Sequence, residues 1–266
     1  MSELLLYDGT TNGFFTAIFE VYERKIDQPT IQRVDRYAKG LFDEPFVVIT
    51  DAKKAERVIA GLKEKTPKGI VGMLVKVLHS EFSDAEEVVF QVAKLAFSLK
   101  GRMGMDYRND SILRMKQINK MMSREIHRMH AFVRFQKTAD DIYASTILPD
   151  FDVIPFIGDH FEKRYADQQW LIYDTKRNYG LFYDLNEMQT ITLYNTEWVA
   201  SNKISKSVLA EGEKVFRDGW ARYFHATCIQ ERKNMRLHLQ HVPHRYWKYL
   251  PEKTRDASQF TDKASG

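Results

Sequence analysis

The 266-residue sequence has one cysteine, Cys228, and no long apolar run. One cysteine cannot form an internal disulfide or supply the ligands of an iron–sulfur cluster, so we expect no such cofactor in this chain. No window approaches 18 consecutive apolar residues, which argues against a membrane-spanning helix. The opening residues MSELLLYDG lack the basic and apolar regions of a signal peptide, and we expect a cytoplasmic protein.

Nucleotide-binding and metal-binding motifs are also missing. The sequence has no P-loop, no Rossmann glycine triplet and no zinc-deaminase signature. His238, His241 and His244 are spaced three apart, as metal ligands on a helix can be, but Pro243 interrupts that helix. Cys228 with His225 upstream has the elements of a nucleophile and its base, although a lone cysteine is more often buried. We therefore expect no bound metal or other cofactor.

Charge is distributed unevenly, although the net charge is only +4. Residues 102–137 contain nine Lys or Arg and three Asp or Glu, a net charge of +6. Residues 138–202 contain four against 11, a net of −7, and residues 203–248 contain ten against four, again +6. Two basic segments in one compact body repel each other unless an anion or solvent lies between them, which favours an anionic partner.

The spacing of apolar residues predicts an α+β fold. Residues 1–101 read as an N-terminal lobe, in which strands at Leu4–Tyr7 and Phe46–Ile49 are each followed by a helix and two further helices complete the lobe. Asp51 is expected to cap the helix after the second strand. Gly101–Gly104 is the clearest internal break.

Residues 102–252 are predicted to form a second lobe, and residues 253–266 a disordered tail. A helix from about Asp110 to Met129 precedes an antiparallel sheet around residues 130–193, because apolar spacing changes from helical to alternating at His130. The expected strands lie at 132–135, 142–147, 170–173, 181–183 and 191–193, with a short helix opened by Pro155. C-terminal helices follow, with Val215, Phe216, Trp220 and Tyr223 on one apolar face.

Cations recur every four positions along the predicted helix at 110–129 and continue into the strand after it. They are Lys116, Lys120, Arg124, Arg128, Arg134 and Lys137. Phosphate binding requires several cations spaced along a surface, whereas an ordinary solvated helix interleaves both signs. The scarcity of carboxylates on this ridge favours phosphate, with a solvated face as the alternative.

A second basic segment, ERKNMRLHLQHVPHRYWKYLPEK, interleaves cations with aromatic rings. Its cations are Arg232, Lys233, Arg236, Arg245 and Lys248, and its aromatics are Tyr246, Trp247 and Tyr249. Such a segment can hold a phosphate backbone while Trp247 stacks on an unpaired base. The alternative is that the aromatic residues pack the C-terminal segment against the body of the protein.

The acidic segment offers a different chemistry. Its aspartates are Asp140, Asp141, Asp150, Asp152, Asp159, Asp167, Asp174 and Asp184. A hydrolase would use such carboxylates, with histidines, to hold a metal or polarise water. Because these aspartates are spread over predicted turns and strand ends, most of them read as turn formers.

Three blocks of the chain resemble a bacterial family of uncharacterised, probable DNA metabolism proteins. They are LLLYDGTTNGFFTAIFEVY, the central region that begins SREIHRMHAFVRFQK, and WARYFHATCIQERKNMRLHLQHVPHRYWKYLPE. The resemblance spans residues 3–252. It implies a setting in DNA repair or modification, because such proteins are typically encoded beside a radical-SAM protein of DNA modification or repair. Some relatives are fused to a uracil-DNA glycosylase-like domain, which this sequence lacks.

The resemblance supplies no catalytic residues. It implies a DNA-binding accessory protein that acts with a radical-SAM partner, which would hold the iron–sulfur cluster. Two alternatives stay open: a DNA-processing hydrolase using Asp and His residues, and a structural partner subunit that does not contact nucleic acid.

Overall fold

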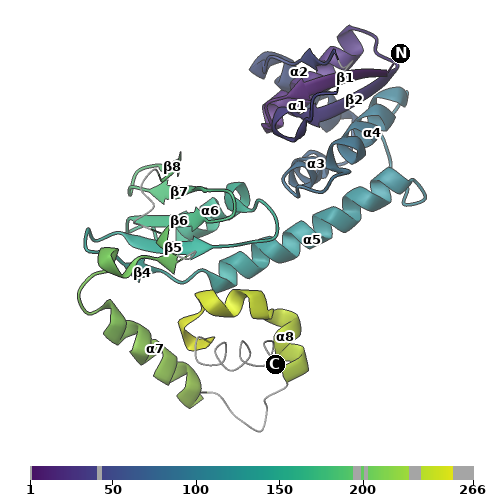
Figure 1. The fold of residues 1–266 in the computed structure, drawn as a ribbon. Coiled ribbons are helices and arrows are strands. Elements are labelled where there is room, and N and C mark those ends of the chain that lie inside the picture. The colour runs from purple at the N-terminus through teal and green to yellow at the C-terminus, as the bar shows by residue number, and fades with distance from the viewer. Residues whose placement is uncertain (1, 41–43, 194–198, 201–202, 228–234, 254–266) are drawn as a thin grey trace. The chain divides into compact units, whose positions relative to one another are not determined.

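A computed structural model describes residues 2–40, 44–193, 199–200, 203–227 and 235–253 (Figure 1). The chain has the predicted α+β fold and divides into two compact units, Met1–Ser123 and Arg124–Gly266. The division falls within helix α5 (Asp110–Phe132), and the break at Gly101–Gly104 lies inside the first unit. The predicted lobes, which divide after Gly101, do not coincide with these units. In the described residues no helix has the length and apolar composition needed to cross a bilayer.

The first unit contains a three-stranded parallel sheet in the order β2-β1-β3. Its strands are β1 (Ser2–Tyr7), β2 (Gln28–Arg33) and β3 (Phe46–Val47), and helix α1 (Thr11–Glu23) links β1 to β2. The sequence predicted the first and third strands but missed β2, which contains Pro29 and mostly polar residues. Proline is tolerated in β2 because it is an edge strand, whose outer N–H groups have no ladder partner.

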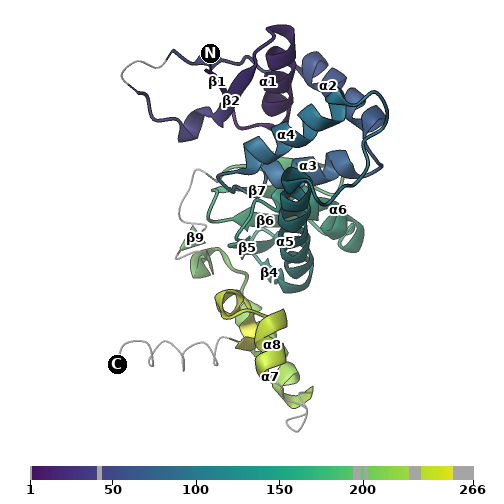
Figure 2. The same cartoon turned by 90° about the vertical axis from the view of Figure 1, so that its right-hand side faces the viewer.

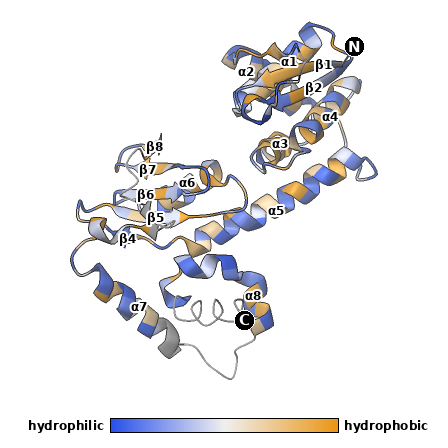
Figure 3. Cartoon of the chain, viewed as in Figure 1, coloured by the Kyte–Doolittle hydropathy of each residue, from blue (hydrophilic) through white to orange (hydrophobic). Residues whose placement is uncertain are grey.

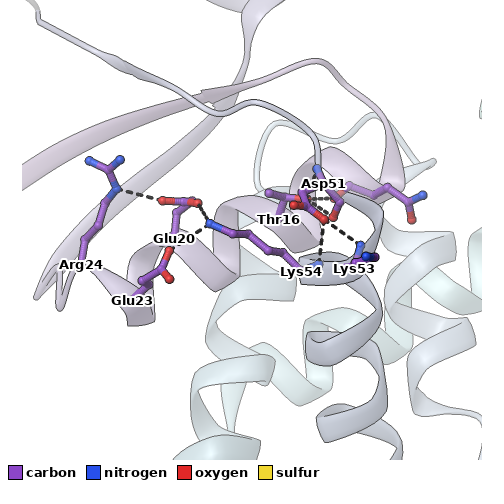
Figure 4. Close-up of polar contacts among 8 residues, drawn as sticks. Thr16, Glu20, Glu23, Arg24, Asp51, Lys53 and Lys54 are labelled. Atoms are coloured by element: carbon purple, nitrogen blue, oxygen red, sulfur yellow. Dashed lines mark hydrogen bonds and ion pairs between the residues drawn. The ribbon is translucent and has the colours of Figure 1, made fainter.

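Helices α2 (Ala52–Lys65), α3 (Ile70–Leu78) and α4 (Ala85–Ser98) complete this unit with the first part of α5. Asp51 caps α2 as predicted, accepting hydrogen bonds from the backbone N–H groups of Lys53 and Lys54. The Lys54 ammonium also contacts Glu20 of α1 at 2.7 Å, joining the two helices (Figure 4).

Helix α5 is amphipathic and longer than predicted. Its apolar stripe is buried and comprises Ile112, Met115, Ile118, Met122, Ile126 and Met129. Polar residues are interspersed with apolar ones along it (Figure 3). The predicted strand at 132–135 is wrong, because Phe132 is still helical and Arg134 Nη1 donates to the Ala131 carbonyl at 2.7 Å. That hydrogen bond satisfies a carbonyl in the last turn, which has no partner within the helix.

The second unit is built on a five-stranded sheet in the order β4-β5-β6-β7-β8, with β4 to β7 side by side in Figure 2. Its strands are β4 (Gln136–Lys137), β5 (Tyr143–Ile147), β6 (Trp170–Asp174), β7 (Tyr179–Tyr183) and β8 (Met188–Ile191). The sheet is not wholly antiparallel as predicted, because β5 and β6 pair in parallel. Helix α6 (Ile154–Arg164) connects these two strands, and such a crossover lets β6 start at the same end of the sheet as β5.

The C-terminal part of this unit follows a short ribbon of β9 (Val199–Ala200) and β10 (Lys203–Ile204). It contains α7 (Glu213–Thr227), α8 (Met235–His241) and the 3-10 helices η5 (His244–Tyr249) and η6 (Pro251–Lys253). The predicted apolar face of α7 is exposed rather than packed: Val215, Phe216 and Tyr223 are 72%, 77% and 61% exposed. Lys253, expected to begin the tail, is buried in η6, while residues 254–266 lie outside the described part.

Gly180 of β7 tests how tightly the central sheet is packed. A Cβ there would lie 2.3 Å from the Ile172 carbonyl oxygen of β6, which the strand cannot accommodate without moving. We expect Gly180→Ala to lower the free energy of unfolding by about 1–3 kcal/mol. Gly219→Ala is the control, because a Cβ on Gly219 in α7 meets no atom within 4 Å and should add about 0.5–1 kcal/mol through lower chain entropy. Urea unfolding measures both, and an unchanged midpoint for Gly180→Ala would contradict the packing described.

Candidate nucleic-acid interface

Three of the predicted cations on α5 are exposed. Lys116 and Lys120 lie on the part of α5 in the first unit, and Arg124 is the first residue of the second. Within the described part of the chain none of the three forms an ion pair, although the Lys116 ammonium lies 5.7 Å from the Tyr107 ring centroid. Their spacing of four residues places them about one helical turn apart on one side of α5.

Arg128 and Arg245, two other predicted phosphate ligands, meet at a buried carboxylate in the second unit. Glu125 is 1% exposed, and its Oε2 accepts from Arg245 at 3.1 Å and from Arg128 at 3.4 Å. Arg245 also contacts the Asp150 carboxylate at 2.7 Å. These two arginines are therefore largely committed to partners within the protein, which leaves them less available for phosphate.

The other oxygen of Glu125 is also satisfied. It accepts hydrogen bonds from the Asp150 backbone N–H at 3.0 Å and from the Tyr246 hydroxyl. Arg245 donates to the same hydroxyl at 2.7 Å, and burial together with Glu125 raises the pKa of Tyr246. The pKa of Arg245 is raised as well: partial burial opposes the shift, but the Tyr246 hydroxyl and the two carboxylates outweigh it. The site is thus a fully bonded carboxylate that ties α5 to η5.

Trp247 was predicted to stack on an unpaired base, and the structure corrects this. Its ring is 1% exposed and its Nε1 donates to the Val242 carbonyl at 2.9 Å. Tyr246 is also buried, at 2% exposed. The aromatic residues of η5 therefore pack the C-terminal segment into the second unit, which was the alternative interpretation.

Arg134 lines a cavity that the sequence analysis did not identify. The cavity has a volume of about 160 Å³ and two further cations, Arg217 of α7 and Lys248 of η5. Ser145 and Thr146 of β5 also line it, and because consecutive strand side chains point to opposite faces, one of their two hydroxyls can face it. No Asp or Glu is found among its described lining residues, so the cavity is basic.

Of the three cations that line the cavity, Arg134 has a carboxylate partner in the described structure. Arg134 Nη2 contacts the buried Glu252 carboxylate at 2.8 Å, and Trp220 Nε1 donates to the other oxygen of Glu252 at 2.9 Å. Arg217 and Lys248 form no ion pair among the residues that the structure describes. Sequence spacing could not reveal this site because its cations come from three separate segments, although Lys248 was noted in the second basic segment.

The other residues that the sequence singled out for nucleic-acid, metal or catalytic roles belong neither to the exposed cations of α5 nor to the basic cavity. Arg236 is exposed on α8, while Arg232, Cys228 and the His225 side chain lie outside the part that is described. His238 and His244 pack against Trp247, with ring centroids 5.9 and 4.1 Å from it. Within the described ranges, no group of three His, Cys, Asp or Glu side chains could hold a metal.

Two of the aspartates that a hydrolase could use, Asp174 and Asp184, are hydrogen-bonded in turns. Asp184 Oδ1 accepts from the backbone N–H groups of Asn186 and Glu187, each at 2.8 Å. Asp174 is fully buried against Arg177 at 2.6 Å, and burial raises its pKa although Arg177 opposes the shift. Such contacts are typical of residues that shape turns.

Two histidines form a closer pair. His130 and His160 stack with ring centroids 4.1 Å apart, and burial lowers the pKa of His130. Among the described contacts, no carboxylate is hydrogen-bonded to either imidazole. A catalytic base would need such a group to orient it, so the geometry gives little support to the hydrolase alternative.

The Glu125 cluster yields a stability prediction. Glu125→Ala should cost about 3–5 kcal/mol, because it leaves partly buried arginines without their carboxylate. All four tryptophans lie in the second unit, so the urea dependence of tryptophan fluorescence reports on that unit alone. Asp159→Ala, which removes an exposed carboxylate from α6, should stay within about 0.5 kcal/mol of the wild type. A loss below 1 kcal/mol for Glu125→Ala would show that the cluster does not hold this unit together.

Comparison with known proteins places the chain in a family whose function is not assigned. No curated protein matches the sequence. A family model described as "Domain of unknown function (DUF4130)" matches residues 83–252, more than half of the chain. This match includes α5, the Glu125 cluster and every residue that lines the basic cavity. The chain therefore belongs to the DUF4130 family of uncharacterised proteins.

Proposed function

We propose that this protein is a DNA-binding accessory protein that acts with a radical-SAM enzyme in DNA repair or modification. The observation that carries the DNA-binding part is the set of exposed cations Lys116, Lys120 and Arg124. They are four residues apart on one helix and form no ion pair among the described residues. A surface helix that only needs solvation gains from neighbouring charges of opposite sign, which these three positions lack.

The charge of the chain supports the same proposal at longer range. Residues 102–137 carry a net charge of +6. Among the described residues, five of their nine cations form ion pairs: Arg108 with Asp106, Arg114 with Asp84, Arg128 with Glu125, Arg134 with Glu252 and Lys137 with Asp141. Exposed cations attract a polyanion and release its counterions when they contact phosphates. The setting in repair or modification comes from the sequence resemblance alone.

The partner part of the proposal is supported by the exposed apolar face of α7. Val215 and Phe216 are more than 70% exposed, and Tyr223 lies two turns along the same helix. An exposed apolar surface of this kind is typical of protein–protein contact sites. The radical-SAM identity of the partner rests on the resemblance, and the cluster chemistry would belong to that protein.

A salt titration tests DNA binding. For the wild type, the logarithm of the binding constant for duplex and single-stranded oligonucleotides should fall linearly with the logarithm of the salt concentration. Replacing Lys116, Lys120 and Arg124 together with Ala should reduce the slope on duplex DNA by about 3 units, at about 0.9 per lost phosphate contact. Fluorescence anisotropy measures the slopes.

The matched control removes the same charge elsewhere. Lys53, Lys63 and Lys68 are also exposed, and their joint replacement with Ala should leave the slope within about 1 unit of the wild type. Equal slopes for both triple variants, or no binding by the wild type at low salt, would show that the α5 cations are only solvated and do not contact DNA phosphates.

The partner surface has a separate test. The double variant Val215→Ser and Phe216→Ser should lose at least about tenfold in affinity for a radical-SAM protein of the kind that the resemblance implies, because two apolar side chains no longer leave water on binding. Sedimentation velocity of the mixed proteins measures the affinity, and Lys214→Gln on the same helix is the control. Unchanged binding by the double variant would exclude this face of α7 as the contact.

A further inference from the structure

The basic cavity of the second unit has an uncompensated positive charge. Arg134, Arg217 and Lys248 line it, and only Arg134 has a carboxylate partner among the described residues. Like charges that share a cavity repel more strongly than at a free surface, because less water screens them. An anion between Arg217 and Lys248 would remove that repulsion.

Two buried nitrogen atoms at this cavity lack hydrogen-bond acceptors. The Nε atoms of Arg134 and Arg217 are inaccessible to solvent and have no partner in the described structure. Leaving a buried donor unpaired costs about 1–3 kcal/mol, and more when the donor is charged. Since both residues line the same cavity, a bound oxyanion would supply acceptors where the protein itself supplies none.

The other walls offer neutral donors. Ser145 and Thr146 are 3% and 8% exposed on β5 beside Gln136 of β4, and because they point to opposite faces of the strand, one of the two hydroxyls can face the cavity. Tyr249 of η5 also lines the cavity, and burial raises the pKa of its hydroxyl to about 12. Guanidinium groups surrounded by hydroxyl donors are a typical environment for phosphate oxygens.

Size and charge restrict the ligand further. A cavity of about 150 Å³ holds a benzene-sized molecule, so a cavity of about 160 Å³ has room for one phosphoryl group and no room for a whole nucleotide. In the described structure Arg217 and Lys248 have no carboxylate partner, although the Lys248 ammonium lies 4.9 Å from the Tyr249 ring centroid. Their combined charge matches the charge of close to −2 that a phosphate monoester carries at neutral pH. A diester within a nucleic-acid backbone carries a single charge and chain on both sides, which hinders its entry.

We propose that the cavity lined by Arg134, Arg217 and Lys248 is a binding site for a phosphate monoester. This goes beyond the proposed function, because the site does not require binding along a DNA backbone. The monoester can be the terminal phosphate of a nucleic-acid strand or a small phosphorylated molecule. Both sources present the same three free oxygens.

Isothermal titration of the full chain with inorganic phosphate, at constant ionic strength, is the first test. We expect saturable binding of one phosphate per chain. Arg217→Gln and Lys248→Gln should each weaken it at least about tenfold, since hydrogen bonds to charged groups contribute about 1.5–3 kcal/mol. Lys214→Gln removes a charge from the same helix outside the cavity and should change the affinity less than twofold.

A second set of titrations distinguishes the two sources of the monoester, a strand end and a small phosphorylated molecule. A 5′-phosphorylated oligonucleotide is compared with the same oligonucleotide bearing a 5′-hydroxyl, and with a deoxynucleoside monophosphate. A preference for the phosphorylated strand that Arg217→Gln abolishes supports a strand end. Binding of phosphate and of the mononucleotide, without preference between the two oligonucleotides, supports a small phosphorylated molecule.

Failure of the site is distinct from failure of the proposed function. Absence of saturable binding with phosphate, mononucleotide and phosphorylated strand alike would overturn the site, as would equal losses for Lys214→Gln and Arg217→Gln. The α5 triple variant should still bind phosphate as the wild type does, whatever its affinity for DNA. If a cavity variant unfolds, the thermal midpoint of the wild type remains decisive: it should rise with phosphate and not with equal ionic strength of chloride.

Discussion

The second unit depends on the burial of one carboxylate, that of Glu125. An ionised carboxylate withdrawn from water is costly unless hydrogen bonds replace its hydration. Four donors surround this one: two arginines, a tyrosine hydroxyl and a backbone N–H. They come from α5, from the loop after β5 and from η5, so satisfying one side chain fixes three separate segments. Asp150 extends the network, because its carbonyl accepts from Arg177 at 3.0 Å in the β6–β7 turn.

This constraint also positions the basic cavity. Lys248 and Tyr249 belong to the same short helix, η5, as Arg245 and Tyr246, which bind Glu125. Two 3-10 turns gain little stability from their own hydrogen bonds, so η5 needs side-chain contacts to hold its place. Buried Tyr246 and Trp247 supply the apolar part of those contacts, and Glu125 supplies the polar part. The cavity residues of η5 are thereby held by groups that do not themselves line the cavity.

The sequence predicted the fold class and most strands of the second unit, because short apolar runs such as those of β6 and β7 are typical of buried strands. The prediction was wrong where a feature depends on contacts between segments that are distant in the sequence. β5 and β6 pair in parallel because helix α6 connects them. The sequence predicted that short helix, but the strands on either side of it were still expected to be antiparallel. The exposed face of α7 has the same amphipathic pattern as a buried one, and only its neighbours distinguish the two.

The site residues show the same limit. Lys116, Lys120 and Arg124 were predicted as exposed cations and are exposed, although binding by them is a proposal. Arg128, Arg134 and Arg245 carry the same charge in the sequence, yet each has a carboxylate partner in the second unit. The predicted repulsion between basic segments is thus partly offset by Glu125, Glu252 and Asp150, which no spacing rule could assign to them.

What remains of the positive charge is of two physical kinds. The cations along α5 stand in water, where salt screens them over about 8–10 Å, and lysine there acts as a mobile point charge. Arg217 and Lys248 line a cavity in which less water screens their charges. The first kind suits a long polyanion contacted at many phosphates, each weakly. The second suits one compact anion contacted by several donors at once, which is why a polyanion is proposed for the first set and a phosphate monoester for the second.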